Sequence, residues 1–246
     1  MKAAPLEWEC FGITDIGLSR VNNEDVWSTL PKEQFFILAD GMGGHQAGEV
    51  ASSMAMQSMC ASVKSLKRKA GIEEVCHFLR EAVTKANMTV YRASLDHPGY
   101  AGMGTTLTCF LLKNHHLVYA HVGDSRLYRY RNTLEQLTQD HSLRQASLST
   151  EGSPPFLFMR NVITRAIGTQ TTILPDIGVI SLCPEDVYML CSDGLSDYVD
   201  RESIACRLAS ALPLEEIGKN LVDAALKSGG NDNITLLLLR IIFTKN

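Results

Sequence analysis

The sequence predicts an α+β fold in which antiparallel sheets are covered by helices. Short apolar runs typical of strands occur early, in the middle and at the end of the chain, and three longer segments repeat apolar residues at helical spacing. The order lacks the regular strand–helix alternation of a doubly wound parallel sheet. The length of 246 residues by itself permits one large domain or two small ones.

Six apolar runs predict strands. They are Phe35–Ala39, Thr105–Leu112, Leu117–Val122, Arg126–Tyr130, Val187–Cys191 and Ile234–Ile242. In the second run, alternate residues from Thr105 to Leu111 share one face of the expected strand. Asn114-His115 and Arg131-Asn132-Thr133 are typical of hairpin turns between neighbouring strands, which favours antiparallel pairing.

Three segments repeat apolar residues at positions i, i+3, i+4 and i+7, and therefore predict helices. The first extends over residues 47–54. The second extends over residues 72–90, and the third over residues 214–225. Gly229-Gly230 follows the third segment and is expected to end that helix. We interpret the three apolar stripes as faces directed toward the core.

Charge and composition limit the possible partners. The net charge is −4, and no long basic stripe is present, which argues against nucleic acid as the main partner. We interpret the local run Lys64–Lys69 as a solvated helix end rather than a binding patch. The longest apolar stretch, Leu236–Phe243, is interrupted by Arg240 and is shorter than the roughly 18 residues of a membrane span. Met1–Cys10 lacks the apolar segment of a signal peptide.

Seven cysteines are scattered along the chain without a Cys-x-x-Cys pair. Because their number is odd and several lie in apolar runs, we expect reduced core residues in a cytoplasmic protein rather than disulfides or zinc ligands. They are Cys10, Cys60, Cys76, Cys109, Cys183, Cys191 and Cys206.

Four aspartates share one sequence context, at the end of a predicted strand and beside glycine. They are Asp40, Asp124, Asp193 and Asp232. Loops at strand ends often carry functional groups, and carboxylate or carbonyl oxygens suit Mg²⁺ or Mn²⁺. Carboxylates brought together repel one another unless a cation neutralises them. A single Asp-Gly pair is usually a turn, but four aspartates in the same context indicate a metal site.

Eight segments resemble the metal-dependent protein phosphatases of type 2C, in their bacterial branch. They are Gly17–Asp25, Leu38–His45, Gly102–Thr106, His121–Arg126, Leu137–Ser142, Val162–Gly168, Cys191–Leu195 and Gly230–Thr235. One of these segments alone would be weak support. The eight together follow the order and approximate spacing of the family, and they extend over nearly the whole chain.

The resemblance implies one catalytic domain over residues 1–246. Its fold would be an α-β-β-α sandwich of two stacked antiparallel sheets flanked by helices, with two Mn²⁺ or Mg²⁺ ions in the cleft between the sheets. It also implies a cytoplasmic monomer that removes phosphate from phosphoserine and phosphothreonine on proteins. Such an enzyme opposes a cognate serine/threonine kinase.

The resemblance also implies roles for individual residues. Asp40 would bridge the two ions, and Asp193 and Asp232 would complete the first ion's site. Glu24 and the carbonyl of Gly41 would serve the second ion, directly or through water. The two ions would make hydroxide available for in-line attack on phosphorus, so that no cysteine need act.

Three further roles follow from the same resemblance. Asp124, together with Asp193, matches the position of a third and weaker ion. Asp25 would support the ligands. Arg20 matches the arginine that grips the substrate phosphate, for which its planar guanidinium is suited.

The proton donor for the leaving group stays unassigned. Part of the family has a histidine two residues after the bridging aspartate, but this chain has Met42 there. His45 is close in sequence, and we expect it to be a polar residue that opens the first helix. We expect His141 to make structural hydrogen bonds to backbone, and Arg126 to form a local salt bridge.

The segment between Ser142 and Asn161 corresponds to the family's flap, about residues 143–160, and is shorter than in typical bacterial relatives. We expect it to influence substrate choice. Two other functions compete with the phosphatase: a catalytically inactive phosphoprotein-binding relative, and an unrelated metal hydrolase such as a nuclease. The three aspartates of the first ion's site argue against the former, and the motif order argues against the latter.

Overall fold

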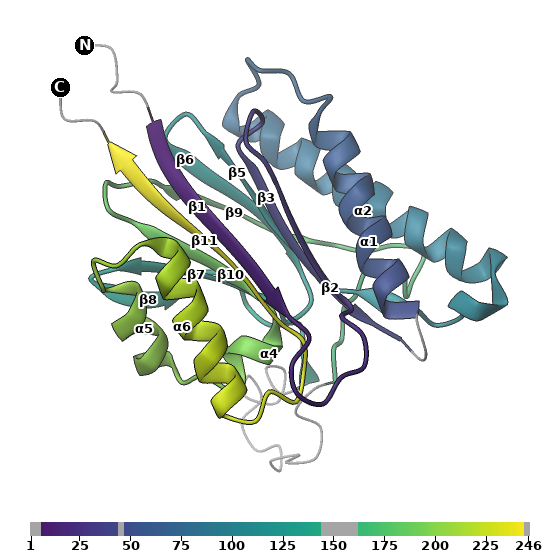
Figure 1. Cartoon of the computed structure of the whole chain (residues 1–246). Helices are drawn as coiled ribbons and strands as arrows, with labels where there is room; N and C mark the ends of the chain where they lie inside the picture. Colours follow the sequence, from purple (N-terminus) through teal and green to yellow (C-terminus); the bar gives the residue numbers. More distant parts are fainter. Residues whose placement is uncertain (1–5, 44–46, 144–161, 244–246) are drawn as a thin grey trace, which may run out of the picture.

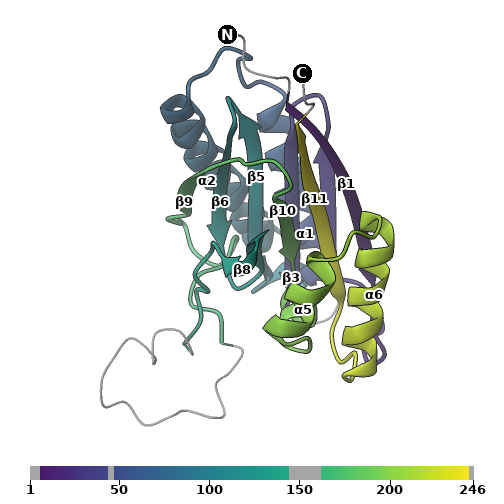
Figure 2. The ribbon, with the colours of Figure 1, turned by 90° about the vertical axis from the view of Figure 1, so that its left-hand side faces the viewer.

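The computed structural model describes residues 6–43, 47–143 and 162–243, which form four layers in the order helix, sheet, sheet, helix (Figure 1). The predicted α-β-β-α sandwich is therefore confirmed. In Figure 2 the strands of both sheets extend along the long direction of the molecule. No helix within these ranges is long and apolar enough to cross a membrane.

The first sheet has five antiparallel strands in the order β1-β11-β10-β7-β8. Their bounds are Leu6–Asp15 (β1), Ile234–Phe243 (β11), Val187–Cys191 (β10), Arg126–Arg131 (β7) and Thr133–Gln136 (β8). The helices on its outer face are α5 (Arg201–Leu208) and α6 (Leu214–Lys227), and the short α4 (Asp193–Ser196) directly follows β10 (Figure 1).

The second sheet has the order β2-β3-β5-β6-β9, and the short β4 pairs with β3. Its strands are β2 (Asp25–Leu30), β3 (Phe35–Met42), β4 (Gly104–Thr105), β5 (Leu107–Lys113), β6 (His116–Val122) and β9 (Asp176–Ser181). Its outer face is covered by α1 (Ala47–Val63) and α2 (Ile72–Asp96), and the 3-10 turn η1 (Pro98–Tyr100) follows α2.

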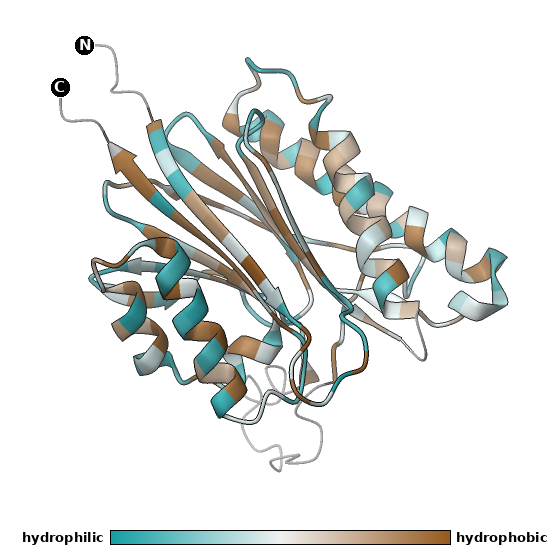
Figure 3. Cartoon of the chain, viewed as in Figure 1, coloured by the Kyte–Doolittle hydropathy of each residue, from teal (hydrophilic) through white to brown (hydrophobic). Residues whose placement is uncertain are grey.

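Alternate residues of the inner strands pack into different layers of the core. On β3, Phe36 and Leu38 lie between the two sheets, whereas Phe35 and Ile37 pack beneath α1 and α2. Strand β11 divides its residues in the same way between the inter-sheet layer and the helix side, and it is hydrophobic over most of its length (Figure 3). Because both faces of these strands are buried, their sequences are continuously apolar.

Five of the six predicted strands and all three predicted helices are present as single elements. Asn114 and His115 form the turn between β5 and β6 with φ values of 49° and 61°, and Asn132 forms the β7–β8 turn with a φ of 63°. Such left-handed conformations are typical of tight hairpin turns. The third helix ends just before Gly229-Gly230, as predicted.

The prediction of one continuous strand over Thr105–Leu112 is wrong. The structure divides it into β4 and β5, because Thr106 leaves the ladder and bonds to Asp40 instead. Four strands, β1, β2, β8 and β9, and the helices α4 and α5 were not predicted from the sequence. All four strands lie at sheet edges, where one neighbour and partial exposure weaken the apolar pattern.

All seven cysteines are free in the structure. The expectation that they are core residues is wrong for several of them. Cys109 and Cys191 are buried, but Cys10 and Cys206 are exposed. Cys10 lies on an edge strand and Cys206 on α5, where a side chain can face solvent.

Candidate functional site

The predicted aspartates come from separate elements but interact with one another at one end of the sandwich. Asp40 lies on β3 opposite Asp25 of β2, Asp193 begins α4, and Asp232 precedes β11. Burial raises the pKa of Asp40 well above its ordinary value, and the charges of Asp25, Asp193, Asp124 and Asp232 raise it further. The structure therefore brings all four predicted aspartates together with Asp25, the residue expected to support them.

Asp40 is fixed through its backbone. Its amide donates to Thr106 Oγ1 at 2.9 Å, and its carbonyl accepts from the Thr106 amide and the Thr105 hydroxyl, each at 2.8 Å. Thr106 Oγ1 also lies 2.7 Å from Ser125 Oγ. Strand β3 continues beyond Asp40 to Met42, so this aspartate lies within the strand and not after it.

Asp25 is 5% exposed, and burial raises its pKa to about 7. Ser192 Oγ donates to Asp25 Oδ2 at 2.7 Å and accepts from the Thr235 amide at 3.0 Å. Ser192 directly precedes Asp193, whose pKa is raised well above its ordinary value by burial and then by Asp124 and Asp232. Ser192 thus links the end of β10, next to Asp193, to the carboxylate of Asp25.

Glu24 and Gly41 meet at the start of α1. The Gly41 amide donates to the Glu24 carbonyl at 3.1 Å. A Cβ atom at Gly41 would lie 2.1 Å from the Gly48 carbonyl oxygen, and one at Gly48 would lie 2.1 Å from Glu24 Oε2. Only glycine fits at either position, because the helix, the strand and the carboxylate approach so closely. Burial raises the pKa of Glu24.

Arg20 lies beside the predicted metal ligand Asp232. Its Nη2 donates to Asp232 Oδ2 at 2.8 Å, and its side chain is 50% exposed. The Asn233 amide donates to the other oxygen, Asp232 Oδ1, at 2.8 Å. Both oxygens of this carboxylate are therefore hydrogen-bonded, and the predicted phosphate-gripping arginine lies within the site.

One carboxylate oxygen of Asp124 is buried without a hydrogen-bond partner among the described residues. This residue is 8% exposed, and the unpartnered oxygen is Oδ1. Burial, and then the charge of Asp140, raise its pKa to about 6. The adjacent Gly123 amide donates to His141 Nδ1 at 3.2 Å, and the His141 amide donates to the Gly123 carbonyl at 2.7 Å. The expected structural role of His141 agrees with these bonds.

Arg126 agrees with its expected role as a salt-bridge residue. Its Nε and Nη2 donate to both oxygens of Asp140, at distances of 2.7–3.0 Å. His45 and nearly all of the flap segment, residues 144–161, lie outside the described residues. The proton donor and the effect of the flap on substrate choice therefore stay predictions.

Within the described ranges, no three histidine, cysteine, aspartate or glutamate side chains are placed to hold one metal ion together. Asp232 is engaged by Arg20, and Asp25 by Ser192. The chemistry of the group nevertheless fits divalent cations. Buried carboxylates with raised pKa values and the unpartnered oxygen of Asp124 are hard donors that a Mg²⁺ or Mn²⁺ ion would neutralise.

Three supporting residues were not identified as such from the sequence. They are Thr106, Ser192 and Asn233. Asn233 accepts from the Glu24 amide at 2.8 Å and donates to the carbonyls of Ile16 and Asn22. Ser192 and Asn233 directly adjoin an aspartate, and Thr106 belongs to the family-like segment Gly102–Thr106. A polar residue at the end of an apolar strand was the feature of the sequence that could have indicated their supporting role.

The chain is similar to known proteins over most of its length. The family described as Protein phosphatase 2C matches residues 20–229. The serine/threonine phosphatase stp of Listeria welshimeri is 35% identical over 235 residues, which covers 92% of this chain and 93% of that protein.

Two solved structures are similar over most of their length. The Mycobacterium tuberculosis serine/threonine phosphatase PstP/Ppp has a TM-score of 0.88 and 32% identity, covering 97% of this chain and 100% of the other. The catalytic domain of the protein phosphatase PstP in complex with two manganese ions has a TM-score of 0.85 and 32% identity, with the same coverage.

Proposed function

The chain belongs to the protein phosphatase 2C family, and from this premise we propose that Asp40, Asp193 and Asp232 are its principal metal ligands. The chain is a metal-dependent protein serine/threonine phosphatase that acts on phosphorylated proteins. The observation that carries the residue assignment is the position of the half-buried Asp40 among four other carboxylates, whose charges raise its pKa together with desolvation. Such a group is stabilised by cations.

Two Mn²⁺ or Mg²⁺ ions are the cofactors, and Asp40 would be a ligand of both. Glu24 and the carbonyl of Gly41 would serve the second ion, and the close approach at Gly41 and Gly48 supports this assignment. Asp124 and Asp193 would hold a third, weaker ion, which the unpartnered Oδ1 of Asp124 supports. When bound, the divalent cations supply Lewis acidity and make hydroxide available from water near neutral pH.

Arg20 binds the substrate phosphate. Its guanidinium is half exposed and lies at Asp232, where a phosphate that enters the site can replace a carboxylate oxygen as the acceptor. A planar guanidinium can donate to two phosphate oxygens at once and so orients the phosphoryl group. Thr106 and Ser192 hold the backbone of Asp40 and the carboxylate of Asp25, so that the ligands are positioned before substrate binds.

Four further features belong to the proposal. Residues 1–246 form one catalytic domain, which the shared core between the two sheets supports. The enzyme is a monomer and opposes a cognate serine/threonine kinase. It acts in the cytoplasm, which the seven unpaired cysteines support.

The direct test is phosphate release from phosphoserine, phosphothreonine and phosphotyrosine peptides, with Mn²⁺ and with a chelator in excess. We expect Mn²⁺-dependent release from the first two peptides and little from the third. Full activity in excess chelator would refute the metal mechanism.

A further inference from the structure

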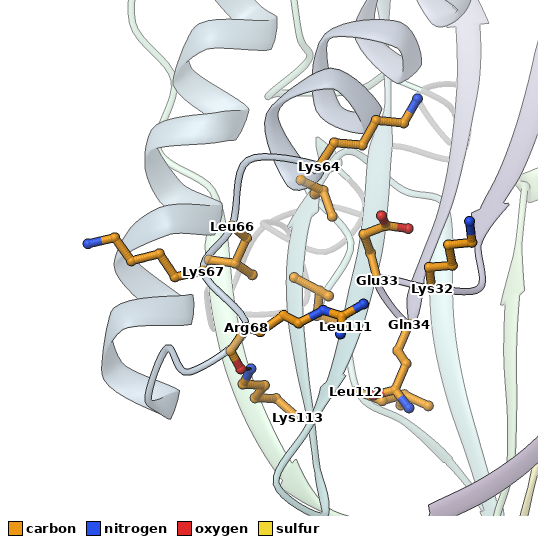
Figure 4. Close-up of a pocket in the computed structure, with 11 residues that line it drawn as sticks. Lys32, Glu33, Gln34, Lys64, Leu66, Lys67, Arg68, Leu111, Leu112 and Lys113 are labelled. Atoms are coloured by element: carbon orange, nitrogen blue, oxygen red, sulfur yellow. Dashed lines mark hydrogen bonds between the residues drawn. The ribbon is translucent and has the colours of Figure 1, made fainter.

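A second charged site lies at the opposite end of β3 from Asp40. There the β2–β3 turn, the chain after α1 and the end of β5 surround a pocket of about 360 Å³ (Figure 4). Gln34 in this pocket lies six positions before Asp40, or about 20 Å away along a strand. The pocket is therefore separate from the candidate metal site.

The charge of this pocket contrasts with that of the whole protein. Five cationic side chains and one carboxylate line it, although the chain has a net charge of −4. The charged residues are Lys32, Glu33, Lys64, Lys67, Arg68 and Lys113. No ion pair joins these side chains to an acid in the described part of the chain. Like charges held this close attract anions.

The walls of the pocket are tied together by hydrogen bonds. Lys113 Nζ donates to the Arg68 carbonyl, which joins the end of β5 to the chain after α1. The Leu112 amide donates to the Gln34 carbonyl at 3.0 Å, which joins β5 to the β2–β3 turn. Leu111 and Val63 are buried and form an apolar floor. The pocket is therefore a fixed part of the fold rather than a chance gathering of surface lysines.

The side chains enter the pocket from different directions. In Figure 4, the Arg68 guanidinium lies over Leu111, and Lys32 and Lys64 lie on either side of Glu33. The Lys67 ammonium points away from the others. A compact ligand can thus receive bonds from Arg68 and from at least one lysine, while Lys67 adds to the potential at the rim.

We propose that this pocket binds a phosphate-bearing anion. A phosphoryl group concentrates close to two negative charges on three acceptor oxygens, whereas a carboxylate carries one charge. Arginine offers a planar fork to such oxygens and lysine a point charge. The pocket is near the lower limit of volumes that hold small ligands, so it accommodates a phosphoryl group with a small attached body. The group can belong to a free anion or to a phosphorylated segment of a protein.

The test is a nuclear magnetic resonance titration of the whole chain with inorganic pyrophosphate, without divalent cations. We expect saturable shifts of the amides of Gln34, Leu66 and Lys113, with half-saturation at about 1 mM or below, within the range of weak specific binding. Amides near Asp40 report binding at the catalytic end separately. The double variant Lys64→Gln, Arg68→Gln should raise the half-saturation concentration at least about tenfold, or 1.4 kcal/mol.

The matched control is Lys85→Gln, Arg92→Gln, which removes two exposed charges from α2. It should leave the half-saturation concentration unchanged. An equal loss in both double variants would mean simple ionic attraction and would overturn the proposal, as would the absence of saturable shifts. A phosphoserine peptide added in place of pyrophosphate distinguishes the sources. Stronger binding than pyrophosphate identifies a protein segment, and weaker binding identifies a free anion.

Discussion

The two ends of β3 carry charges of opposite sign in opposite surroundings. At one end, the half-buried Asp40 lies among other carboxylates, of which Asp25 and Asp124 are buried. At the other, Lys64, Lys67 and Arg68 are exposed around an open pocket. One strand of eight residues thus joins a buried acidic end to a solvated basic end.

The difference shows how burial decides the effect of like charges. Water screens exposed cations, so their mutual repulsion costs little and they need no fixed partner. The carboxylates have lost most of that water, and their pKa values rise as a result. Bound protons or cations therefore stabilise the acidic end, whereas the basic end can accept an anion without requiring one.

Replacement of Asp40 should have the largest effect. We expect Asp40→Asn to lower kcat/KM more than about 1,000-fold, above the 10–100-fold that partners of metal ligands typically contribute. In excess chelator the same change should raise the melting temperature at neutral pH, because it removes one of several repelling charges. Phosphate release and thermal unfolding measure the two effects.

Asp96→Asn is the matched control, because Asp96 is an exposed acid at the end of α2. It should change neither activity nor the melting temperature in chelator. A fall in the melting temperature of the Asp40 variant would show that repulsion does not dominate at the acidic end.

Saturating Mn²⁺ should stabilise the protein, and more so at higher pH. Burial raises the pKa of Asp25 to about 7 and that of Asp124 to about 6, so the folded chain binds protons more tightly than the unfolded chain. In chelator, this stabilisation is present at low pH and is lost as the pH rises through about 6 to 7. Mn²⁺ competes with these protons and restores the stability.

The size of the Mn²⁺ effect follows from mass action. At 100 times the dissociation constant, a ligand contributes about 2.7 kcal/mol, or about 5–10 °C for a chain of this length. We expect this rise near pH 7.5 and a smaller one near pH 5. At each pH, the melting temperature with Mn²⁺ is compared with that without Mn²⁺. The contributions of groups away from the site then cancel. His121, whose pKa is lowered to about 4 by burial, is one such group. An equal rise at both pH values would contradict proton competition.

Arg20 tests whether the exposed edge of the acidic end binds substrate. We expect Arg20→Ala to lower kcat/KM by about 10–100-fold, the loss of about 1.5–3 kcal/mol in charge-assisted hydrogen bonds. Mn²⁺ affinity, measured by calorimetry, should not weaken. Arg20→Lys should recover only part of the activity, because lysine lacks the planar fork. Arg92→Ala, at an exposed position on α2, should retain full activity.

Much of the fold could be predicted from the sequence, because the inner strands are buried on both faces. β3, β10 and β11 are continuously apolar, and their pattern is clear without any partner. Strands β1, β2 and β9 lie at edges and mix exposed with half-buried residues, so their pairing is decided by neighbours that the sequence alone does not place.

Like the inner strands, the aspartates could be predicted from the sequence, because each follows or precedes an apolar run beside glycine. The residues that position these aspartates could not be predicted in this way. Thr106 and Ser192 act through hydrogen bonds to residues 66 and 167 positions away in the chain. No local pattern reports such distant partners, and Thr106 lay within a run that was predicted as uninterrupted strand.

Thr106 therefore offers a smaller test of how the acidic end is held. We expect Thr106→Val to lower the free energy of unfolding by about 1–3 kcal/mol, because the buried Asp40 amide loses its acceptor. Thr106→Ser keeps the hydroxyl and should lose about 1 kcal/mol or less, close to one buried methyl group. Urea unfolding in chelator measures both. Equal losses would assign the effect to packing rather than to the hydrogen bond.

The basic end should respond least, which is the sharpest contrast with Asp40. Lys64→Gln, Arg68→Gln removes two like charges, yet we expect the free energy of unfolding to change by no more than about 0.5 kcal/mol, as for other exposed substitutions. The reason is that water already screens these cations, so little repulsion remains to be relieved. Urea unfolding at low and high salt measures the effect. If this double variant gained as much stability as Asp40→Asn gains in chelator, the repulsion between like charges would be equally strong at the two ends. Burial would then not distinguish them.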